Sequence, residues 1–440
     1  MKKIHEALQE VIEPMIALSE DIYRNPELGF KEFRTREKVI EQLNKFGIPY
    51  EDAAYTGLIA TIDSGKKGPV IGLICELDAV PTTGHPYANQ VDCAAHTCGH
   101  YAQIGVMLSL FIALKQANSL SELCGKVKLI VTPAEEFCDM DYRRQIIKEG
   151  KVQHPSGKRE MIATGVLDDV DVMLSCHTMG LDMNTYHAEI GASLNGFIQK
   201  TAIFHGKATH AGANPEGGIN ALNAANLAMT GINFLRETFR AEDAIRVHFI
   251  MPEAGNSINT VPARARIDMY VRAKSTHAIL ETNQKVNQAL RGGAMAIGCD
   301  VEIVDTPGYF PLHQDENLTE FVKKQIEQYM EEDKIAEGTH GFASGDMGDL
   351  SMMWPIVEIG IAGFSGTMHG KDFKTEDTEQ AYKVPAHYFA DTVIELLSND
   401  GKAAWEIKEK FVPVMDKETY LKTLDDLSKT TVYKKGEKEI

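Results

Sequence analysis

The sequence contains no long hydrophobic run and no excess of basic residues. None of its apolar stretches approaches the roughly 20 residues that a helix needs to cross a bilayer. Residues 1–23 are amphipathic and acidic, without the continuous apolar core of a signal peptide. Lys and Arg (45) are outnumbered by Asp and Glu (63), which gives a formal net charge of −18. Since nucleic acids and anionic membranes bind basic surfaces, neither is an expected partner.

Cysteine is also sparse. The chain has 7 cysteines, an odd number without the spacing of a disulfide framework. This pattern is typical of proteins in a reducing compartment, so we expect a cytoplasmic protein. The 440 residues are 43% hydrophobic and 25% charged, which is the composition of a globular protein with a sizeable core. The length predicts two domains.

Alternating helical and strand patterns predict an α/β fold for the first part of the chain. The predicted helices are 2–24, 35–46 and 104–115, and the predicted strands are 57–62, 70–75, 126–132 and 170–175. The run at 70–75 is nearly all apolar, as expected of a strand buried on both faces. Strands that alternate with helices indicate a mostly parallel sheet.

The pattern changes near residue 190. Further strands are predicted at 193–204, 244–251 and 263–272, and further helices at 219–235 and 276–295. These elements form a small α+β unit inserted into the first domain. We therefore predict one domain made of residues 1–189 plus 306–440, and an inserted domain of residues 190–305. The tail from residue 403 has helical periodicity to 427 and a Lys-rich end that is expected to fray.

Three of the predicted strands end in residues that bind metal or transfer protons. Asp78 follows the second strand, and the pair Glu135 and Glu136 follows the third. His177 follows the fourth strand. The carboxyl ends of parallel strands meet at one edge of a sheet, and ligands bind there in such folds. These side chains are therefore expected to lie close together.

The segment His96–His100 (HTCGH) joins a thiol and two imidazoles within five residues. For Cys98 and His100 alone, a buried cysteine beside a helix-capping histidine would be the preferred interpretation. Cys and His are, however, the softer metal ligands. With His96 adjacent and Gly99 letting the backbone fold around an ion, metal binding becomes the better interpretation.

Glu135 and Glu136 form the second element of the predicted site. Most glutamate pairs are solvated acidic turns, which is the alternative here. This pair follows a buried strand and a proline, and adjacent carboxylates at a strand end point to different sides. One of them can therefore bind a metal while the other acts on a water molecule as a general base.

His177 and His369 complete the candidate ligands, although each is a weak signal alone. With Cys98, His100 and one glutamate they supply five N, S or O ligands, which suits two transition-metal ions that share a ligand. A thiolate can bridge two ions, and imidazole favours Zn, Mn, Co or Ni over Mg or Ca. Asp78 is a candidate for orienting a ligating histidine.

Several motifs follow one another along nearly the whole chain. They are Arg24–Phe30 (RNPELGF), Glu76–Pro81 (ELDAVP), His96–His100, Pro133–Glu136 (PAEE), His210–Pro215 (HAGANP), Gly218–Ala225 (GINALNAA), Asn259–Pro262 (NTVP) and His369. In these motifs the sequence resembles metallopeptidase family 20, and within it the amidohydrolases of the hippurate hydrolase, indole-acetyl-amino-acid hydrolase and aminobenzoyl-glutamate hydrolase type. Residues 344–351 (SGDMGDLS) are more similar to the aminobenzoyl-glutamate hydrolase branch.

The resemblance implies a metal-dependent amidohydrolase that cleaves the amide bond of N-acyl amino acids or related small amino-acid conjugates. Residues 1–189 plus 306–440 would form its catalytic domain. Cys98 would bridge two divalent ions, Zn or Mn with Co or Ni as further options, and Glu135 would be the general base. The remaining ligands implied by the resemblance are His100, Glu136, His177 and His369.

The resemblance also implies that residues 190–305 form a dimerisation or lid domain, so that the protein is a homodimer. His210 and Asn259 of this domain are implied to contact the substrate, and Asp78 to support a ligand histidine. A dipeptidase or exopeptidase of the same family remains an alternative. A catalytically silent relative that binds an amino-acid conjugate is another, although the retained Glu135 favours an enzyme.

The sequence departs from the family pattern at four places. His177 is followed by Thr178, Met179 and Gly180, where an aromatic residue and a proline are common. Glu76 stands where an aspartate is more usual, and Tyr101 where an aspartate or asparagine is common. A polar segment near 139–155 is expected to be an insertion. Tyr101 and the segment after His177 are therefore candidates for lining the substrate pocket.

Overall fold

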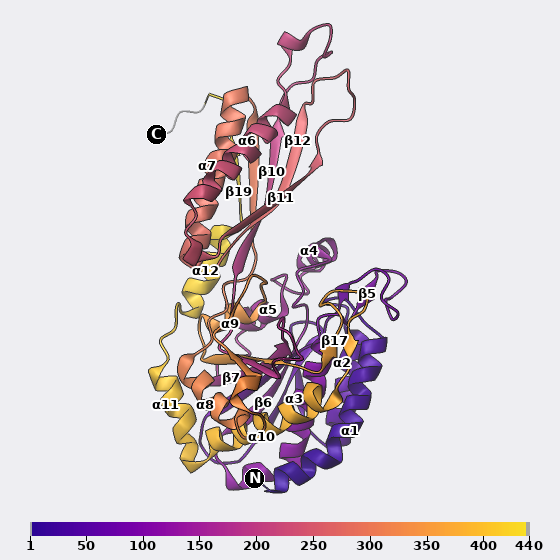
Figure 1. Ribbon diagram of the computed structural model, residues 1–440, viewed down its shortest axis with the longest axis vertical. Helices are drawn as coiled ribbons and strands as arrows, with labels where there is room; N and C mark the ends of the chain where they lie inside the picture. The colour runs from indigo at the N-terminus through magenta and orange to yellow at the C-terminus, as the bar shows by residue number, and fades with distance from the viewer. Residues whose placement is uncertain (1, 437–440) are drawn as a thin grey trace. The chain divides into compact units, whose positions relative to one another are not determined.

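The chain folds into two units, each built around its own β-sheet (Figure 1). The computed structural model describes residues 2–436. Within these, the larger unit comprises residues 2–193, 313–341 and 345–417, and the smaller comprises 194–312, 342–344 and 418–436. The last stretch of the chain, which was predicted to continue the first domain, thus returns to the smaller unit.

An eight-stranded sheet in the order β1-β2-β6-β3-β7-β16-β8-β14 forms the centre of the larger unit. Its strands are β1 (Tyr50–Ala53), β2 (Gly57–Asp63), β3 (Val70–Glu76), β6 (Lys126–Thr132), β7 (Val172–Thr178), β8 (Ala188–Ile190), β14 (Ile335–Glu337) and β16 (Ile356–Ile361). The four central strands β6, β3, β7 and β16 are parallel. This confirms the predicted α/β class with a mostly parallel sheet.

Helices α1, α3 and α10 pack together against one face of this sheet, and apolar side chains of alternate strand residues join their core. α3 is buried along nearly its whole length and begins at His100, four residues earlier than predicted. The helices of this unit are α1 (Lys2–Arg24), α2 (Phe33–Lys45), α3 (His100–Gln116), α4 (Met140–Lys148), α5 (Gly157–Thr164), α8 (Glu316–Ile326), α9 (Met347–Ser351), α10 (Val384–Leu397) and α11 (Lys402–Lys410).

The smaller unit is an antiparallel five-stranded sheet in the order β11-β12-β10-β13-β19, with α6 and α7 packed on it (Figure 1). Its strands are β10 (Gly196–His205), β11 (Arg246–Glu253), β12 (Arg264–Ala273), β13 (Asp300–Pro307) and β19 (Lys429–Tyr433), and its helices are α6 (Ala221–Leu235), α7 (Thr276–Ile297) and nearly all of α12 (Lys417–Leu427). β19 pairs with β13, so part of the tail that was expected to fray is an edge strand.

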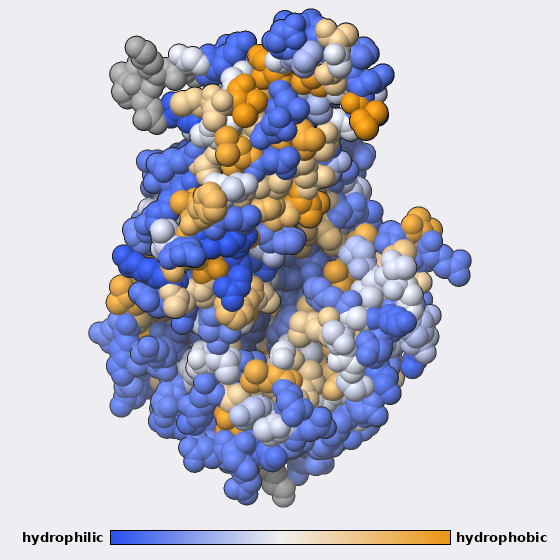
Figure 2. Space-filling model, turned by 45° about the horizontal axis from the view of Figure 1, so that its top comes forward, coloured by the Kyte–Doolittle hydropathy of each residue, from blue (hydrophilic) through white to orange (hydrophobic). Residues whose placement is uncertain are grey.

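Hydrophobic side chains are visible among hydrophilic ones on the surface of the smaller unit (Figure 2). Large exposed apolar residues of this unit are Leu227, Phe234, Ile250, Ile258, Met295, Phe342 and Val432. Across residues 2–436, no helix combines the length and the apolar character that crossing a membrane requires.

Candidate metal centre

Parallel pairing brings the ends of three strands to one edge of the large sheet. Asp78 lies two residues beyond β3, Glu135 lies three beyond β6, and His177 is the last residue but one of β7. β3 pairs with both of the other strands in parallel. The expectation that strand ends would gather these side chains thus agrees with the observed topology.

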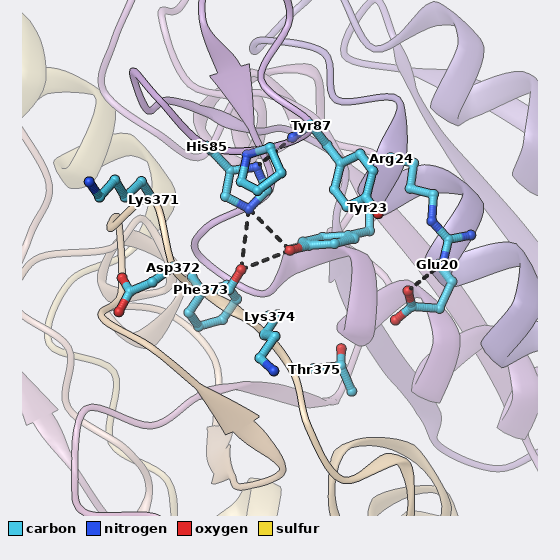
Figure 3. Close-up of a pocket in the computed structure, with 11 residues that line it drawn as sticks. Glu20, Tyr23, Arg24, His85, Tyr87, Lys371, Asp372, Phe373, Lys374 and Thr375 are labelled. Atoms are coloured by element: carbon cyan, nitrogen blue, oxygen red, sulfur yellow. Dashed lines mark hydrogen bonds and ion pairs between the residues drawn. The ribbon is translucent and has the colours of Figure 1, made fainter.

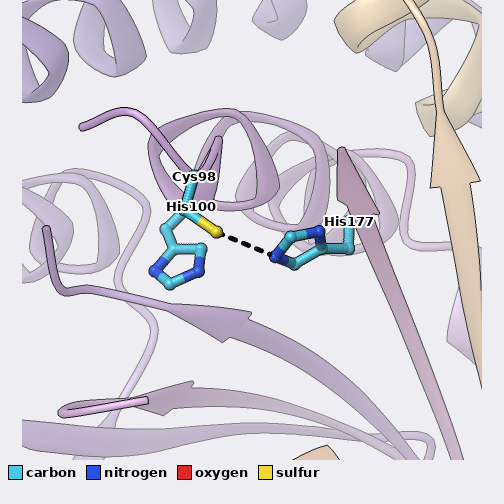
Figure 4. A group of neighbouring side chains, drawn as sticks. All are labelled: Cys98, His100 and His177. Carbon is cyan, nitrogen blue, oxygen red and sulfur yellow. Dashed lines mark hydrogen bonds between the residues drawn. The ribbon is translucent and has the colours of Figure 1, made fainter. Parts of the chain in front are cut away.

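Cys98 belongs to two groups of metal-binding atoms. Its Sγ lies with one atom each of His100 and His177 in one group, and with one atom each of Glu136 and His369 in the other. Within each group all donor atoms lie within 4.8 Å of one another. Figure 4 shows the Cys98 thiol pointing at the His177 ring, with 3.4 Å between Sγ and Nε2. The five predicted ligands are therefore neighbours, with the cysteine common to both groups.

The turn that carries Cys98 and His100 depends on Gly99. Its φ of +90° lies in the left-handed region, which side chains with a Cβ rarely adopt. A Cβ at this position would come within 1.9 Å of Thr178 Oγ1, so the close approach of this turn to the end of β7 also requires glycine. This contact holds Cys98 and His100 beside His177.

Asp78 holds two of the candidate ligands in place. Its backbone carbonyl accepts a hydrogen bond from His100 Nδ1 at 2.9 Å, and its carboxylate accepts one from the backbone N–H of Glu136 at 2.9 Å. With a proton held on Nδ1, the neutral His100 ring would present the Nε2 lone pair that a metal ligand requires. Nε2 of His100 lies 3.2 Å from Glu76 Oε2, and Oε1 of Glu136 lies 3.1 Å from Nε2 of His369, so each atom faces another candidate donor. The donors present thus fit divalent transition-metal ions.

Burial and neighbouring charges favour a proton on two of the donors, which metal binding would have to displace. Burial would lower the pKa of His100, but Glu76 and Cys98 outweigh burial and raise it well above its usual range. Burial and the Glu136 charge raise the pKa of the Cys98 thiol. A bound cation would favour the thiolate and the neutral imidazole, because metal binding releases the protons of its ligands.

Glu135 is buried and surrounded by other carboxylates. Its Oε1 accepts a hydrogen bond of 3.3 Å from the backbone N–H of Asp346, and its Oε2 lies 3.9 Å from His100 Nε2. Burial, followed by the charges of Glu76 and Glu136, raises its pKa well above the usual range. A carboxyl group with a raised pKa is suited to taking up and releasing a proton.

Buried charged side chains form hydrogen bonds with the backbone on both sides of Glu135. Ala134 has a positive φ of +55°, and its N–H donates to Glu32 Oε1 at 2.8 Å. The guanidinium of Arg143 donates to the carbonyls of Ala134 and Glu136, on either side of the catalytic candidate. Arg143 comes from α4, inside the segment predicted only as a polar insertion, so the insertion supports the site.

Two residues near the motif lie away from the donor groups. Tyr101 was a candidate for lining the pocket, but it is fully buried and its hydroxyl bonds Thr375 Oγ1 at 2.7 Å. That expectation is wrong, because α3 begins at His100 and turns Tyr101 into the core. His96 is buried as well, and burial lowers the pKa of its imidazole to about 3.

His210 and Asn259 lie together in the smaller unit, on paired segments. The N–H of Ala211 donates to the Asn259 carbonyl at 2.8 Å. His210 Nδ1 accepts the N–H groups of Gly212 and Ala213 at 3.1 and 3.0 Å, which places the ring proton on the exposed Nε2. His210 is thus prepared to donate a hydrogen bond.

A cavity of about 460 Å³ lies beside the segment that follows His369 (Figure 3). Tyr23 of α1 donates its hydroxyl proton to the Phe373 carbonyl at 2.8 Å, and His85 Nε2 lies within 3.0 Å of the same hydroxyl. These bonds anchor the chain just beyond His369 to the first helix. The Arg24–Phe30 motif therefore begins at this cavity, which Arg24 lines.

Sequence reasoning missed several charged residues of the site. Lys158 and Asp346 are fully buried and form an ion pair, and Glu32 is buried beside the Glu135 backbone. Only Asp346 had a signal, since it lies in the segment 344–351. Nothing in the local pattern around Lys158 distinguishes it from a surface lysine.

A strand-end site with a cysteine, imidazoles and paired glutamates fits a metal-dependent hydrolase. The sequence matches the model of Peptidase family M20/M25/M40 over residues 72–395. The chain therefore belongs to this family, which confirms the predicted resemblance and the hydrolase class.

Named relatives share about a quarter of their residues with this chain. It is 27% identical over 377 residues to the Xaa-Arg dipeptidase of Mus musculus, covering 81% of this chain and 78% of the relative. It is 27% identical over 357 residues to the indole-3-acetyl-aspartic acid hydrolase of Enterobacter agglomerans, covering 69% and 76%. Among solved structures, a dinuclear metal binding peptidase of the M20 family from Bacillus subtilis has the same fold, with a TM-score of 0.69, 21% identity and coverage of 88% and 99%.

Proposed function

We propose that this protein is a metal-dependent amidohydrolase that cleaves the amide bond of N-acyl amino acids or related amino-acid conjugates. One observation carries the proposal: Cys98 belongs to both groups of donor atoms, at the strand ends where this fold binds ligands. The similarity to an indole-3-acetyl-aspartic acid hydrolase supports a conjugate of this kind as substrate.

Two divalent ions are proposed as cofactors. Cys98 would be shared, His100 and His177 would complete one group, and Glu136 and His369 the other. This assignment rests on the donor groups, and the solved relative described as dinuclear supports it. Thiolate and imidazole donors favour Zn, and the carboxylate of Glu136 also suits Mn, with Co or Ni as further options. Bound divalent ions supply Lewis acidity, which acidifies water and polarises a carbonyl.

Glu135 is proposed as the general base. Its carboxylate would take a proton from the attacking water and then pass it to the leaving nitrogen, so that the proton leaves with the amine. Asp78 would keep His100 in the tautomer that exposes Nε2. His210 Nε2–H and the Asn259 amide are proposed to contact the substrate, because both present hydrogen-bond donors on an exposed surface.

A Glu135→Gln variant tests the role of the base. It should bind as much metal as the wild type, because the amide is isosteric, and it should lose at least about a hundredfold in kcat. Metal content by elemental analysis and turnover under saturating substrate separate the two effects. Substantial residual turnover would remove Glu135 as the base.

A dipeptidase is the second candidate function. The similarity to an Xaa-Arg dipeptidase over 81% of this chain favours it, and the bond broken is the same amide. A hydrolysis screen distinguishes the candidates: N-acetyl, N-benzoyl and aminobenzoyl amino acids are set against dipeptides, with Zn, Mn, Co and Ni supplied in turn. The proposal expects the acyl conjugates to be cleaved faster. Inactivity towards every compound by metal-loaded protein would favour a silent conjugate-binding relative.

A homodimer through the smaller unit is proposed as well. The resemblance implies such a dimer, and the exposed side chains Phe234 and Ile258, 74% and 101% exposed, are candidates for burial in its interface. Light scattering on the wild type and on Phe234→Asp would show whether this surface joins two copies. The free state of all 7 cysteines supports a proposed cytoplasmic location.

A further inference from the structure

A cluster of three carboxylates lies beside the two donor groups that contain Cys98. Oxygen atoms of Glu76, Glu135 and Asp346 lie within 4.8 Å of one another, and all three residues are buried. Three carboxylates so close repel one another strongly in a medium of low dielectric constant. A compensating positive charge is therefore required.

Lys158 of α5 supplies this charge. Its side chain is fully buried, and its ammonium group forms ion pairs with both Glu76 and Asp346. Burial would lower the pKa of Lys158, yet the charges of Asp346, Glu76 and Glu135 raise it well above its usual value. The ammonium thus stays charged, and it takes the position that a cation would need in order to bind Glu76 and Asp346 together. This cluster is therefore not a further metal site.

The contacts of Lys158 extend to the proposed base and to a proposed ligand. On one side it holds Asp346, whose backbone N–H donates to Glu135 at 3.3 Å. Asp346 is also held by the Ser156 hydroxyl at 2.7 Å. On the other side Lys158 holds Glu76, whose Oε2 lies 3.2 Å from His100 Nε2.

We propose that Lys158 is a positioning residue that fixes Asp346 and, through the Asp346 N–H, the carboxylate of the base Glu135. This inference rests on the proposed function of Glu135. Lys158 reaches neither substrate nor metal in this role. Its loss changes the alignment of the base, and a misplacement of about 1 Å costs up to about a hundredfold in rate.

The neighbouring pair Arg159 and Asp349 provides a matched control. It joins α5 to α9 by an ion pair of 2.9 Å, whereas Lys158 joins α5 to the N-cap residue of α9, and all four side chains are deeply buried. Asp349 is in none of the groups of metal-binding atoms. Breaking this pair should destabilise the protein in a similar way without moving Glu135.

The test compares three variants in the metal-loaded full-length protein: Lys158→Met/Asp346→Asn, the single Asp346→Asn, and the control Arg159→Met/Asp349→Asn. The first removes one positive and one negative charge, so that the net charge of the cluster is unchanged. Glu76 loses its Lys158 partner but keeps the hydrogen bond from Gln103 Nε2 at 2.7 Å. It should lose about ten- to a hundredfold in kcat, with KM within about threefold and metal content unchanged. Asp346→Asn is isosteric and keeps the backbone N–H, so it should fold and lose several-fold in kcat. The control should keep the wild-type kcat well below its melting temperature.

Wild-type kcat in Asp346→Asn would overturn the inference, and so would an equal loss of kcat in the control. A fall in metal content that accounts for the lost activity would also overturn it, because Lys158 would then act on the ligands. If the wild type cleaves its substrate and Glu135→Gln does not, the proposed function stands whatever the Lys158 result. Inactive wild type with both ions bound would refute the proposed function itself.

Discussion

Gly99→Ala is expected to disrupt the donor groups through one methyl group. The added Cβ would lie 1.9 Å from Thr178 Oγ1 and 3.1 Å from Thr178 Cβ, so either the end of β7 or the Cys98–His100 turn must move. The left-handed φ of +90° costs an L-residue about 1–2 kcal/mol, and overpacking adds about 1–3 kcal/mol. We therefore expect the free energy of unfolding to fall by about 2–5 kcal/mol.

Gly65→Ala is the matched control for this experiment. Gly65 has a similar φ of +75°, and nothing lies within 4 Å of a Cβ placed there. Replacing Gly65 by alanine should lower the free energy of unfolding only by the cost of the left-handed backbone conformation, about 1–2 kcal/mol. Urea unfolding of the metal-free proteins measures both losses, and elemental analysis after reconstitution measures bound metal. Gly99→Ala should bind less metal than Gly65→Ala; equal stability losses together with equal metal contents would refute the reasoning.

Two further predictions concern the core of the larger unit. Tyr101→Phe removes the hydrogen bond to Thr375 and should lower the free energy of unfolding by about 1 kcal/mol; a changed substrate preference would show that Tyr101 reaches the pocket after all. His5 and His387 meet through Nδ1 atoms 2.7 Å apart, and His5 Nε2 bonds Asp391. Burial and the His5 charge lower the pKa of His387 in the folded protein. This contribution to the free energy of unfolding should therefore be fully present above the pKa of histidine in the unfolded chain, about 6.5, and should be lost as the pH falls below it. Between pH 7.5 and pH 5, the free energy of unfolding should fall less for metal-free His387→Leu than for the metal-free wild type. An equal fall in the two proteins would contradict this.

The central elements were predictable because periodicity and burial agree in them. The run at 70–75 is apolar on both faces and became β3, buried along its whole length. Helix 2–24 was found although Pro14 lies inside it, since its apolar spacing persists across the proline. The start of α3 was predicted too late because His100 and Tyr101 do not continue the apolar run that identified the helix. The fold nevertheless buries both side chains within it.

The five candidate ligands were predictable from residue type, since strand ends and a Cys/His turn gather them. The residues that hold them in place were not. Arg143 bonds backbone carbonyls, and Lys158 bonds carboxylates that are 82 and 188 residues away in the chain. Tertiary packing sets such contacts, and the spacing of residues along the sequence does not predict them. Strand β19 was missed for the same reason. It pairs with the edge strand β13, which lies far from it in the sequence.

The central claim is that the Cys98 thiolate is shared by two metal ions. The most direct test is the number of ions per chain, measured by elemental analysis after dialysis against zinc, for the wild type, Cys98→Ala and the control Cys176→Ala. Cys176 is a buried cysteine of β7 outside the donor groups. We expect two ions in the wild type and in the control. Cys98→Ala should bind fewer than one, because both groups lose the same donor. Two ions in Cys98→Ala would contradict the shared thiolate.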